Sequence, residues 1–254
     1  MIDICLFGAW AIYDSERRLS MTEFHGVKPR LVLGLLALNL GRPISKERLA
    51  DHLWAGTPPP SWLSTLEGYV SLLRKAVAPL DNSSSTAIVS RNGAYLLNAD
   101  QVGTDLDRFD RLLVEARAAD PSRSLQQFHA ALEIPRGEVL LGERSLPWIL
   151  ETRERYQREW HRAAVQAGRL ALSVDDIEVA GRYGKLACDL DPLAEDAWQI
   201  LIESEWRANR RADALRNFSA LRAMLDRELG ITPCRALQQL FTRVLRDEPY
   251  GLSA

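Results

Sequence analysis

The sequence lacks the residue patterns on which most enzymes and metalloproteins depend. Its three cysteines, Cys5, Cys188 and Cys234, are far apart and form no CxxC pair, so neither a zinc site nor a disulfide framework is indicated. The four histidines are scattered and lack metal-ligand spacing. A GxxxxGK[ST] phosphate loop, a GxGxxG turn after a strand and an HExxH motif are all missing. We therefore expect no metal, no cofactor and no catalytic activity.

Long apolar runs and a strong net charge are missing too. The longest apolar stretch, residues 31–40, is about half as long as a membrane span and contains Asn39. The N-terminus has an acid at its third position and no basic segment, so no secretory signal is visible. We expect a cytoplasmic protein with no membrane partner. The formal net charge is −2, so a case for nucleic-acid binding has to rest on local features.

What is present is the composition of a soluble protein, 46% hydrophobic and 26% charged, arranged in two patterns. Residues 1–98 mix short β-type segments with helical ones, whereas residues 105–250 show helical periodicity alone. The sequence therefore predicts a mainly α fold with a small β part. We expect one domain at 1–98 and a second, all-helical domain at 105–250.

The first 54 residues predict two strands followed by two helices. Residues 2–13 are rich in β-branched and aromatic side chains and indicate a strand bent at Gly8, with a returning strand at 19–24. A helix is expected over 28–40, ended by Gly41. Ser45 is expected to cap the next helix.

A third helix, over residues 60–77, is the stretch around which this half of the chain is organised. Its apolar residues recur three and four apart, Pro60 marks its entry and Ser61 is expected to cap it. Its other face is polar and consists of Ser64, Thr65, Glu67, Gly68, Ser71, Arg74 and Lys75. Small residues allow close approach to another surface, and the late Arg-Lys pair suits phosphates. On spacing alone, an amphipathic core helix with a solvated face is the favoured interpretation, and the segments on either side of the helix shift the balance towards DNA binding.

A β-hairpin follows this helix. Residues 87–90 and 94–97 are apolar runs, and the Asn92-Gly93 pair between them is a strong turn signal. Strands, three helices and a hairpin in this order make a winged helix-turn-helix. In such a unit the third helix enters the major groove of DNA and the hairpin lies along the neighbouring backbone.

The rest of the chain predicts stacked helical hairpins. The expected helices are 105–118, 122–134, 147–172, 176–190, 194–208, 211–229 and 234–247. Ala180 and Ala214 lie 34 residues apart in comparable helices, and this is the tetratricopeptide (TPR) period.

Short matches along nearly the whole chain resemble one family. They include Leu6-Phe7-Gly8, Lys28-Pro29-Arg30, Leu53-Trp54, Thr65-Leu66, Leu73-Arg74-Lys75, Ile88-Val89-Ser90-Arg91, Asp105-Leu106-Asp107-Arg108-Phe109, Gly137-Glu138-Val139-Leu140 and Gly230-Ile231-Thr232-Pro233. In this order they resemble the Streptomyces antibiotic regulatory protein type of transcription factor. The resemblance implies an OmpR-like winged helix joined to a TPR-like bacterial transcriptional activator domain. It also implies an activator that binds direct repeats of double-stranded DNA near promoters as a dimer and contacts the sigma or alpha subunit of RNA polymerase.

Carried over by position, the resemblance gives a set of DNA-binding residues. With the polar neighbours from the same helix and turn they are Ser64, Thr65, Glu67, Gly68, Tyr69, Ser71, Arg74, Lys75, Arg91 and Asn92. Thr65, Arg74, Lys75 and Arg91 have groups that hold phosphate, and Arg91 is the expected wing contact. Glu67 can accept a hydrogen bond from cytosine N4 or position a neighbour.

Three positions depart from the family pattern. Ser64, Ser71 and Leu72 stand where arginine is common in this class, so we expect weak DNA binding by one copy and useful affinity from two. Leu72 can contact a thymine methyl group or pack inside the domain, and we expect packing.

Aromatic residues near this helix have two interpretations. Trp54, Trp62, Tyr69 and Tyr95 are either stacking partners for bases or core residues, and we expect core. The alternative function for the whole chain is a TPR-like protein-interaction adaptor with weak or vestigial DNA binding.

Overall fold

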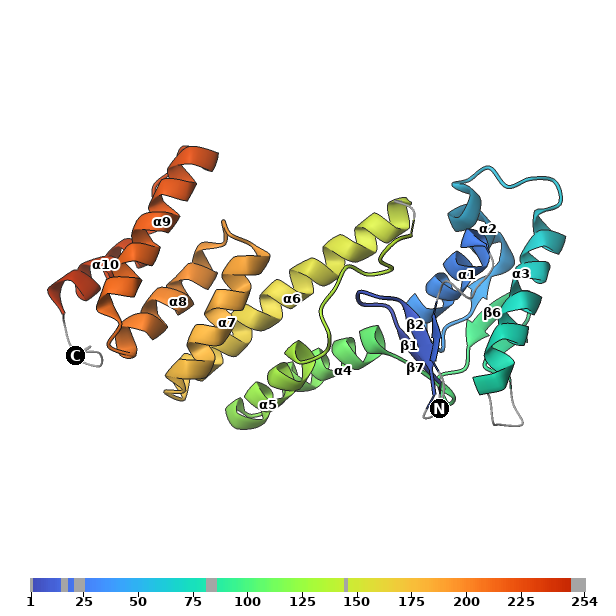
Figure 1. The fold of residues 1–254 in the computed structure, drawn as a ribbon, viewed down its shortest axis with the longest axis horizontal. Helices are drawn as coiled ribbons and strands as arrows, with labels where there is room; N and C mark the ends of the chain where they lie inside the picture. Colours follow the sequence, from blue (N-terminus) through green and yellow to red (C-terminus); the bar gives the residue numbers. More distant parts are fainter. Residues whose placement is uncertain (1, 15–17, 21–25, 81–85, 144–145, 248–254) are drawn as a thin grey trace. The chain divides into compact units, whose positions relative to one another are not determined.

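The computed structural model of the chain describes residues 2–14, 18–20, 26–80, 86–143 and 146–247. These residues are mainly helical, with a small β part in the N-terminal half (Figure 1), which confirms the predicted fold class. The chain divides into two compact units. Unit 1 comprises 1–112 and 133–155, and unit 2 comprises 113–132 and 156–254. The predicted domains at 1–98 and 105–250 remain a prediction.

The first sheet of unit 1 is built from both ends of the N-terminal half. Its strands are β1 (Ile2–Cys5), β2 (Ala11–Tyr13), β3 (Arg18–Ser20) and β7 (Val102–Thr104), in the order β3-β2-β1-β7. Strand β1 is antiparallel to β2 and parallel to β7. The expected strand over 2–13 is thus two strands, with Gly8 between them at φ 70°, a backbone region that glycine enters without strain. The expected returning strand appears as β3, and residues 21–24 lie outside the described part of the chain.

Three helices form the centre of unit 1. They are α1 (Val27–Leu38), α2 (Lys46–Trp54) and α3 (Trp62–Val77), followed by the short 3-10 helix η2 (Ala78–Leu80). Helix α1 ends at Leu38 with Asn39 as its cap, two residues before Leu40, the expected last residue of the helix. Gly41, at φ 72°, belongs to the following turn, where its N–H donates to the carbonyl of Leu97.

The two predicted caps have opposite outcomes. The Ser45 hydroxyl accepts the N–H of Arg48 at 3.2 Å, so this cap is confirmed. Ser61 is the first residue before α3, but its side chain makes no capping hydrogen bond. Its backbone conformation, φ −90° and ψ 17°, is not the extended one that aims a cap side chain at the helix amides.

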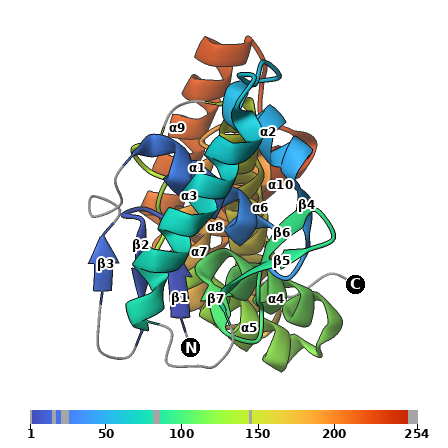
Figure 2. The ribbon, with the colours of Figure 1, turned by 90° about the vertical axis from the view of Figure 1, so that its right-hand side faces the viewer.

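A second sheet lies next to α3 (Figure 2) and contains the predicted hairpin. Its order is β4-β6-β5, from β4 (Ile44–Ser45), β5 (Ile88–Arg91) and β6 (Ala94–Leu97). Asn92 at φ 48° and Gly93 at φ 75° make the hairpin turn, which confirms the turn signal in the sequence. Strand β4 was not predicted, because two residues directly before a helix cap carry no strand pattern.

A later stretch of the chain, residues 133–155, completes unit 1. Phe7 and Val139 form an antiparallel bridge, and the N–H of Leu140 donates to the carbonyl of Leu6 at 2.9 Å. Gly137 lies directly on Gly8, since a Cβ at Gly137 would be 2.4 Å from the Gly8 Cα. The chain can pass here only because Gly137 lacks a side chain, whereas a Cβ on Gly8 would lie 3.8 Å from the Gly137 Cα, an ordinary contact.

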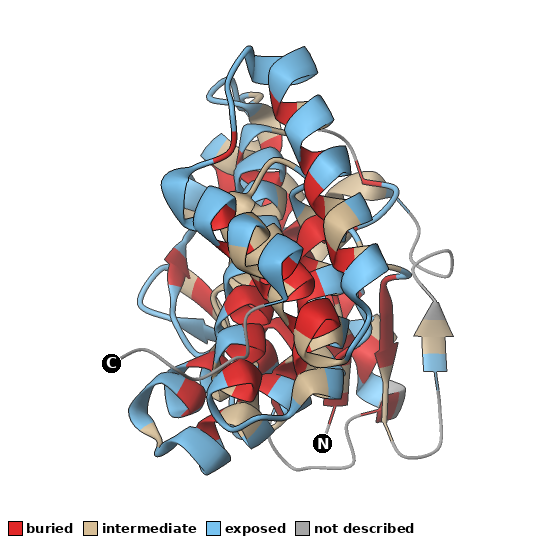
Figure 3. Cartoon of the chain, turned by 90° about the vertical axis from the view of Figure 1, so that its left-hand side faces the viewer, coloured by how far each residue is buried: buried red, intermediate tan, exposed pale blue. Residues whose placement is uncertain are grey.

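The helical part agrees closely with the sequence prediction. Its helices are α4 (Asp105–Ala118), α5 (Pro121–Leu132), α6 (Pro147–Ser173), α7 (Ile177–Leu190), α8 (Glu195–Arg207), α9 (Arg211–Leu229) and α10 (Arg235–Arg246). From α7 onward, consecutive helices pack side by side (Figure 1). Their buried residues lie on the faces that meet, and their outer faces are exposed (Figure 3).

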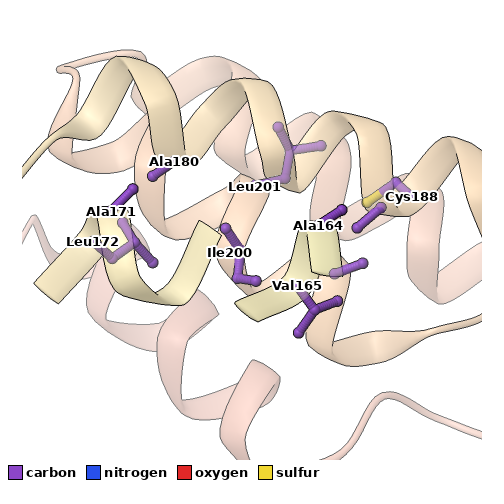
Figure 4. Close-up of a cluster of buried hydrophobic side chains, with 10 residues drawn as sticks. Ala164, Val165, Ala171, Leu172, Ala180, Cys188, Ile200 and Leu201 are labelled. Atoms are coloured by element: carbon purple, nitrogen blue, oxygen red, sulfur yellow. The ribbon is translucent and has the colours of Figure 1, made fainter. Parts of the chain in front are cut away.

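Small side chains let α6, α7 and α8 approach one another closely. Their shared core includes Ala164, Ala180 and Ile200 (Figure 4), together with Ala187 and Ala197. A Cβ at Gly184 would lie 2.8 Å from the backbone nitrogen of Leu201, so α7 touches the α8 backbone there. Such repeated, closely packed hairpins are the arrangement that the TPR-like period predicts.

Candidate nucleic-acid interface

Helix α3 presents the predicted polar face to solvent. Leu66, Val70, Leu73 and Val77 are buried and hold α3 against its own unit, where α1 and α2 are its helical neighbours. On the opposite side, residues at positions 64, 67, 68, 71 and 75 are exposed. A Cβ placed on Gly68 would meet nothing within 4 Å, so this side of the helix is open. Three of these positions are Ser64, Gly68 and Ser71, and their short side chains suit close contact with a groove.

The hydroxyl groups at the start of α3 are hydrogen-bonded within the helix. Ser64 and Thr65 both donate to the carbonyl of Ser61, at 3.1 and 2.9 Å. Their oxygen lone pairs stay available as acceptors, but each must rotate its proton away from Ser61 before it can donate to a phosphate.

The acidic residue on this face is paired with a lysine from another helix. Glu67 Oε1 lies 2.7 Å from Lys46 Nζ at the start of α2. The hydrogen bond that Lys46 donates to Glu67 raises the pKa of Lys46 above its ordinary value. Lys46 thus compensates the negative charge that Glu67 would otherwise bring to DNA. Sequence reasoning missed Lys46 because it lies on a different helix, 21 residues earlier.

The guanidinium group of Arg74 is turned towards the hairpin. Its Nε donates to the carbonyl of Ile88 at 3.0 Å and its Nη2 donates to the Ser90 hydroxyl at 2.8 Å. Its Cζ also lies 6.0 Å from the centre of the Tyr95 ring. Arg74 therefore joins α3 to β5, an arrangement that the sequence does not reveal. Its neighbour Lys75 is exposed.

The hairpin presents the predicted wing residues at its tip. Arg91, Asn92 and Gly93 are all exposed. Tyr95 is only 4% exposed, so the prediction that it is a core residue is confirmed. Lys46 Nζ lies 5.5 Å from the same ring.

The prediction that Leu72 packs inside the domain is wrong. Its side chain is 52% exposed, because a residue one position before Leu73 is turned about 100° away from the buried stripe. Leu72 borders a cavity of about 300 Å³ on the flank of α3, together with Lys28, Leu53 and Tyr69.

The prediction of core positions also fails for three aromatic residues. Trp54, Trp62 and Tyr69 are of intermediate burial, at the edge of the unit. The Trp54 and Tyr69 rings stack at 6.4 Å, and Lys28 Nζ lies 4.4 Å from the centre of the Trp54 ring. The Trp54 and Tyr69 rings thus cover one another at the surface of the unit.

Two negative findings apply to the described residues. No helix among them is long and apolar enough to cross a bilayer. No group of three or more His, Cys, Asp or Glu side chains in the same part of the chain is placed to bind a metal ion.

The sequence is similar to a known family and to named bacterial proteins. Residues 104–245 match the family described as "Bacterial transcriptional activator domain". Regulatory protein DnrI of Streptomyces peucetius is 31% identical over 87% of this chain and 85% of its own length. Transcriptional regulator RedD of Streptomyces coelicolor is 28% identical, and regulatory protein AfsR of the same species is 31% identical. This chain spans 65% of the length of RedD and 22% of the length of AfsR.

A solved structure has the same fold. Mycobacterium tuberculosis EmbR, in complex with a low-affinity phosphopeptide, matches with a TM-score of 0.80 at 23% identity. The match covers 98% of this chain and 66% of that one.

Proposed function

The chain belongs to the Streptomyces antibiotic regulatory protein type of DNA-binding transcriptional regulators, and from this premise we propose how it holds DNA. Helix α3 lies in the major groove with Ser64, Gly68 and Ser71 towards the bases. The tip of the β5–β6 hairpin lies along the adjacent backbone, where Arg91 contacts phosphate or the minor groove. The proposal contains no catalytic step.

One observation carries this proposal. The exposed face of α3 has short polar side chains and an open glycine, and a hairpin with an arginine at its tip is hydrogen-bonded to the same helix. An α-helix fits the major groove of B-DNA, and a neighbouring ribbon can then reach the backbone beside it. If the polar face of α3 only contacted water, neither the adjoining hairpin nor the short side chains would have an explanation.

We further propose that two copies bind side by side on direct repeats. Lys75 and Arg91 are exposed cations of the predicted set, whereas Arg74 donates to the hairpin and Ser64, Ser71 and Leu72 are uncharged. Each phosphate contact contributes about 0.9 to the slope of log K against log salt, so one copy with so few contacts binds weakly. Two joined copies gain effective concentration and bind as one unit.

We propose that the helical part contacts RNA polymerase, through its sigma or alpha subunit. The match to the activator-domain family covers α4 to α10, and these helices keep their outer faces exposed. Helical-hairpin repeats use such faces to bind other proteins.

A salt-series binding assay tests the DNA part. Fluorescence anisotropy with the protein's own upstream promoter DNA and with a random duplex of equal length gives both affinities. We expect tighter binding to the promoter DNA at every salt concentration. Equal affinity for both duplexes at low salt would favour the adaptor function instead.

An in vitro transcription assay tests the activator part. Purified RNA polymerase with its principal sigma factor is run on the promoter with and without the protein. We expect more transcript with the full chain. DNA binding without any change in transcript would contradict the polymerase contact.

A further inference from the structure

Arg74 makes the contacts of a structural tie, although its position in the sequence matches a phosphate ligand. Its guanidinium donates to the Ile88 carbonyl at 3.0 Å and to the Ser90 hydroxyl at 2.8 Å. Both acceptors belong to β5, and the residue that follows Ser90 is Arg91 at the tip of the hairpin. The tie therefore ends one residue away from the predicted wing contact.

The edge of the sheet explains why this tie is needed. In the order β4-β6-β5, the described part of the chain gives strand β5 a sheet neighbour on one side only. The N–H of Asn98 donates to the carbonyl of Ala87, so the next pair, Ile88 opposite Leu97, is a non-hydrogen-bonded pair. The Ile88 carbonyl consequently points away from β6, and Arg74 supplies its hydrogen bond.

The planar guanidinium is suited to this role. It presents donors in a fixed fork, and here two of them reach acceptors two residues apart on one strand. The Tyr95 ring, which packs the hairpin from β6, lies 6.0 Å from the same group. A lysine keeps the positive charge but cannot hold both acceptors in one geometry.

We propose that Arg74 is a positioning residue: it fixes the hairpin against α3 so that Arg91 reaches the DNA backbone while α3 occupies the major groove. The proposal rests on the DNA-binding function argued above. It assigns the phosphate contact on this side to Arg91 and makes that contact depend on Arg74.

A double-mutant cycle with a conservative variant tests the proposal. The variants are Arg74→Lys, Arg91→Ala and the pair, measured by anisotropy on the promoter duplex over a salt series. We expect Arg74→Lys to weaken binding and to flatten the salt slope by about as much as Arg91→Ala, although it keeps its charge. In the Arg74→Lys background, the factor by which Arg91→Ala lowers DNA affinity should be at least about five-fold smaller than in the wild type.

Lys75→Ala is the matched control, because Lys75 is the exposed neighbour of Arg74 on α3. Its effect and that of Arg91→Ala should multiply, as expected for independent phosphate contacts. Ser90→Ala removes one of the two hydrogen bonds and tests the tie without altering any charge. Like Arg74→Lys, it should make the loss of affinity caused by Arg91→Ala smaller.

Amide hydrogen exchange in the free protein gives a readout that needs no DNA. We expect faster exchange over 88–97 in Arg74→Lys than in Lys75→Ala. The inference would be overturned if Arg74→Lys bound the promoter duplex as tightly as the wild type. It would also be overturned if Arg91→Ala lowered the affinity by the same factor with Arg74 and with Lys at position 74. Failure of the wild-type protein to bind the promoter duplex would instead overturn the proposed function.

Discussion

At the scale of single residues, Asp105 gives a structural reason for the Asp-Leu-Asp-Arg-Phe motif at residues 105–109. Its carboxylate accepts the N–H groups of Leu6, Phe7 and Leu106, each at 2.9 Å. Burial raises the pKa of this carboxyl, while those N–H groups act to lower it. Asp105 thus joins the stretch after β1 to the start of α4, so the Asp-Leu-Asp-Arg-Phe motif has a structural role.

We predict that Asp105→Ala destabilises unit 1. The substitution leaves the N–H groups of Leu6 and Phe7 without their acceptor, and each buried unsatisfied group costs about 1–3 kcal/mol. Urea denaturation should show a free energy of unfolding lower by about 2–6 kcal/mol, the sum for the two groups. The control is Asp107→Ala, which removes the exposed pair with Arg111 and should cost less than about 1 kcal/mol. Equal losses in both variants would contradict this role.

A second residue-scale prediction concerns the Lys46–Glu67 pair. Lys46→Met leaves the Glu67 carboxylate uncompensated on the α3 face, where it repels phosphates. We expect promoter affinity to fall roughly three-fold or more, as for other charges at the rim of an interface. Adding Glu67→Gln to Lys46→Met should restore most of it. Anisotropy at constant salt measures both variants, and a further loss in the double variant would show that Glu67 makes a favourable contact of its own.

At the scale of elements, α3 has fewer cations than the family pattern, and single substitutions can add arginine at the positions concerned. Ser71→Arg places a guanidinium on the exposed face of α3, and Leu72→Arg places one on its flank. We expect each to raise promoter affinity and to steepen the salt slope by up to about 0.9, the value for one phosphate contact. Leu141→Arg, an equally exposed leucine of unit 1 outside α3, controls for added charge alone. An identical gain from all three would argue against α3 as the DNA-facing helix.

Helix α2 has a titratable group that makes unit 1 sensitive to acid. Burial and the charge of Arg48 lower the pKa of His52 below its ordinary value of 6.5. Its ring meets the Trp148 ring edge-on at 6.2 Å. The unfolded chain therefore binds the proton more readily than the folded one. The stability that His52 contributes is present above pH 6.5 and is lost as the pH falls through the folded-state pKa.

We expect this loss to appear in urea denaturation followed from pH 7.5 to pH 5. The midpoint should fall over this range in the wild type and should fall less in His52→Gln, which cannot take up a proton. Parallel curves for the two proteins would show that other groups cause the acid sensitivity.

The elements also show what the sequence could and could not predict. Helices were predicted to within a few residues because their apolar periodicity runs over three turns or more. The Asn92-Gly93 turn was predicted because its backbone conformation demands those residues. Strands β4 and β7 were not, since two or three residues carry no period and their pairing partners are distant in sequence.

The candidate site was predicted less completely, for a related reason. The exposed face of α3 and the hairpin tip follow from local patterns. The partners of Arg74 and Glu67 lie on other elements, so only the fold shows that one is tied to the hairpin and the other to Lys46. Ser61 was expected to cap α3 and does not, because its backbone at φ −90° and ψ 17° is not extended, and a sequence pattern does not show this.

At the scale of the whole molecule, the proposed dimer leads to a prediction about DNA length. A duplex with two half-sites one helical turn apart should bind at least about 100-fold tighter than a duplex with one half-site. Gel-shift titration at physiological salt measures both. Displacing the second half-site by five base pairs, half a turn, should abolish the gain. Equal affinity for all three duplexes would contradict cooperative side-by-side binding.

The path of the chain through unit 1 has a consequence for how the protein is made. Val139, bridged to Phe7, and Gly137, lying on Gly8, come more than 100 residues after the strands they complete. On the ribosome, the N-terminal half must therefore wait for residues up to 155 to emerge before its last pieces are in place. During that interval Phe7 has not yet formed its bridge with Val139, and the part of unit 1 that residues 133–155 complete stays open on the nascent chain.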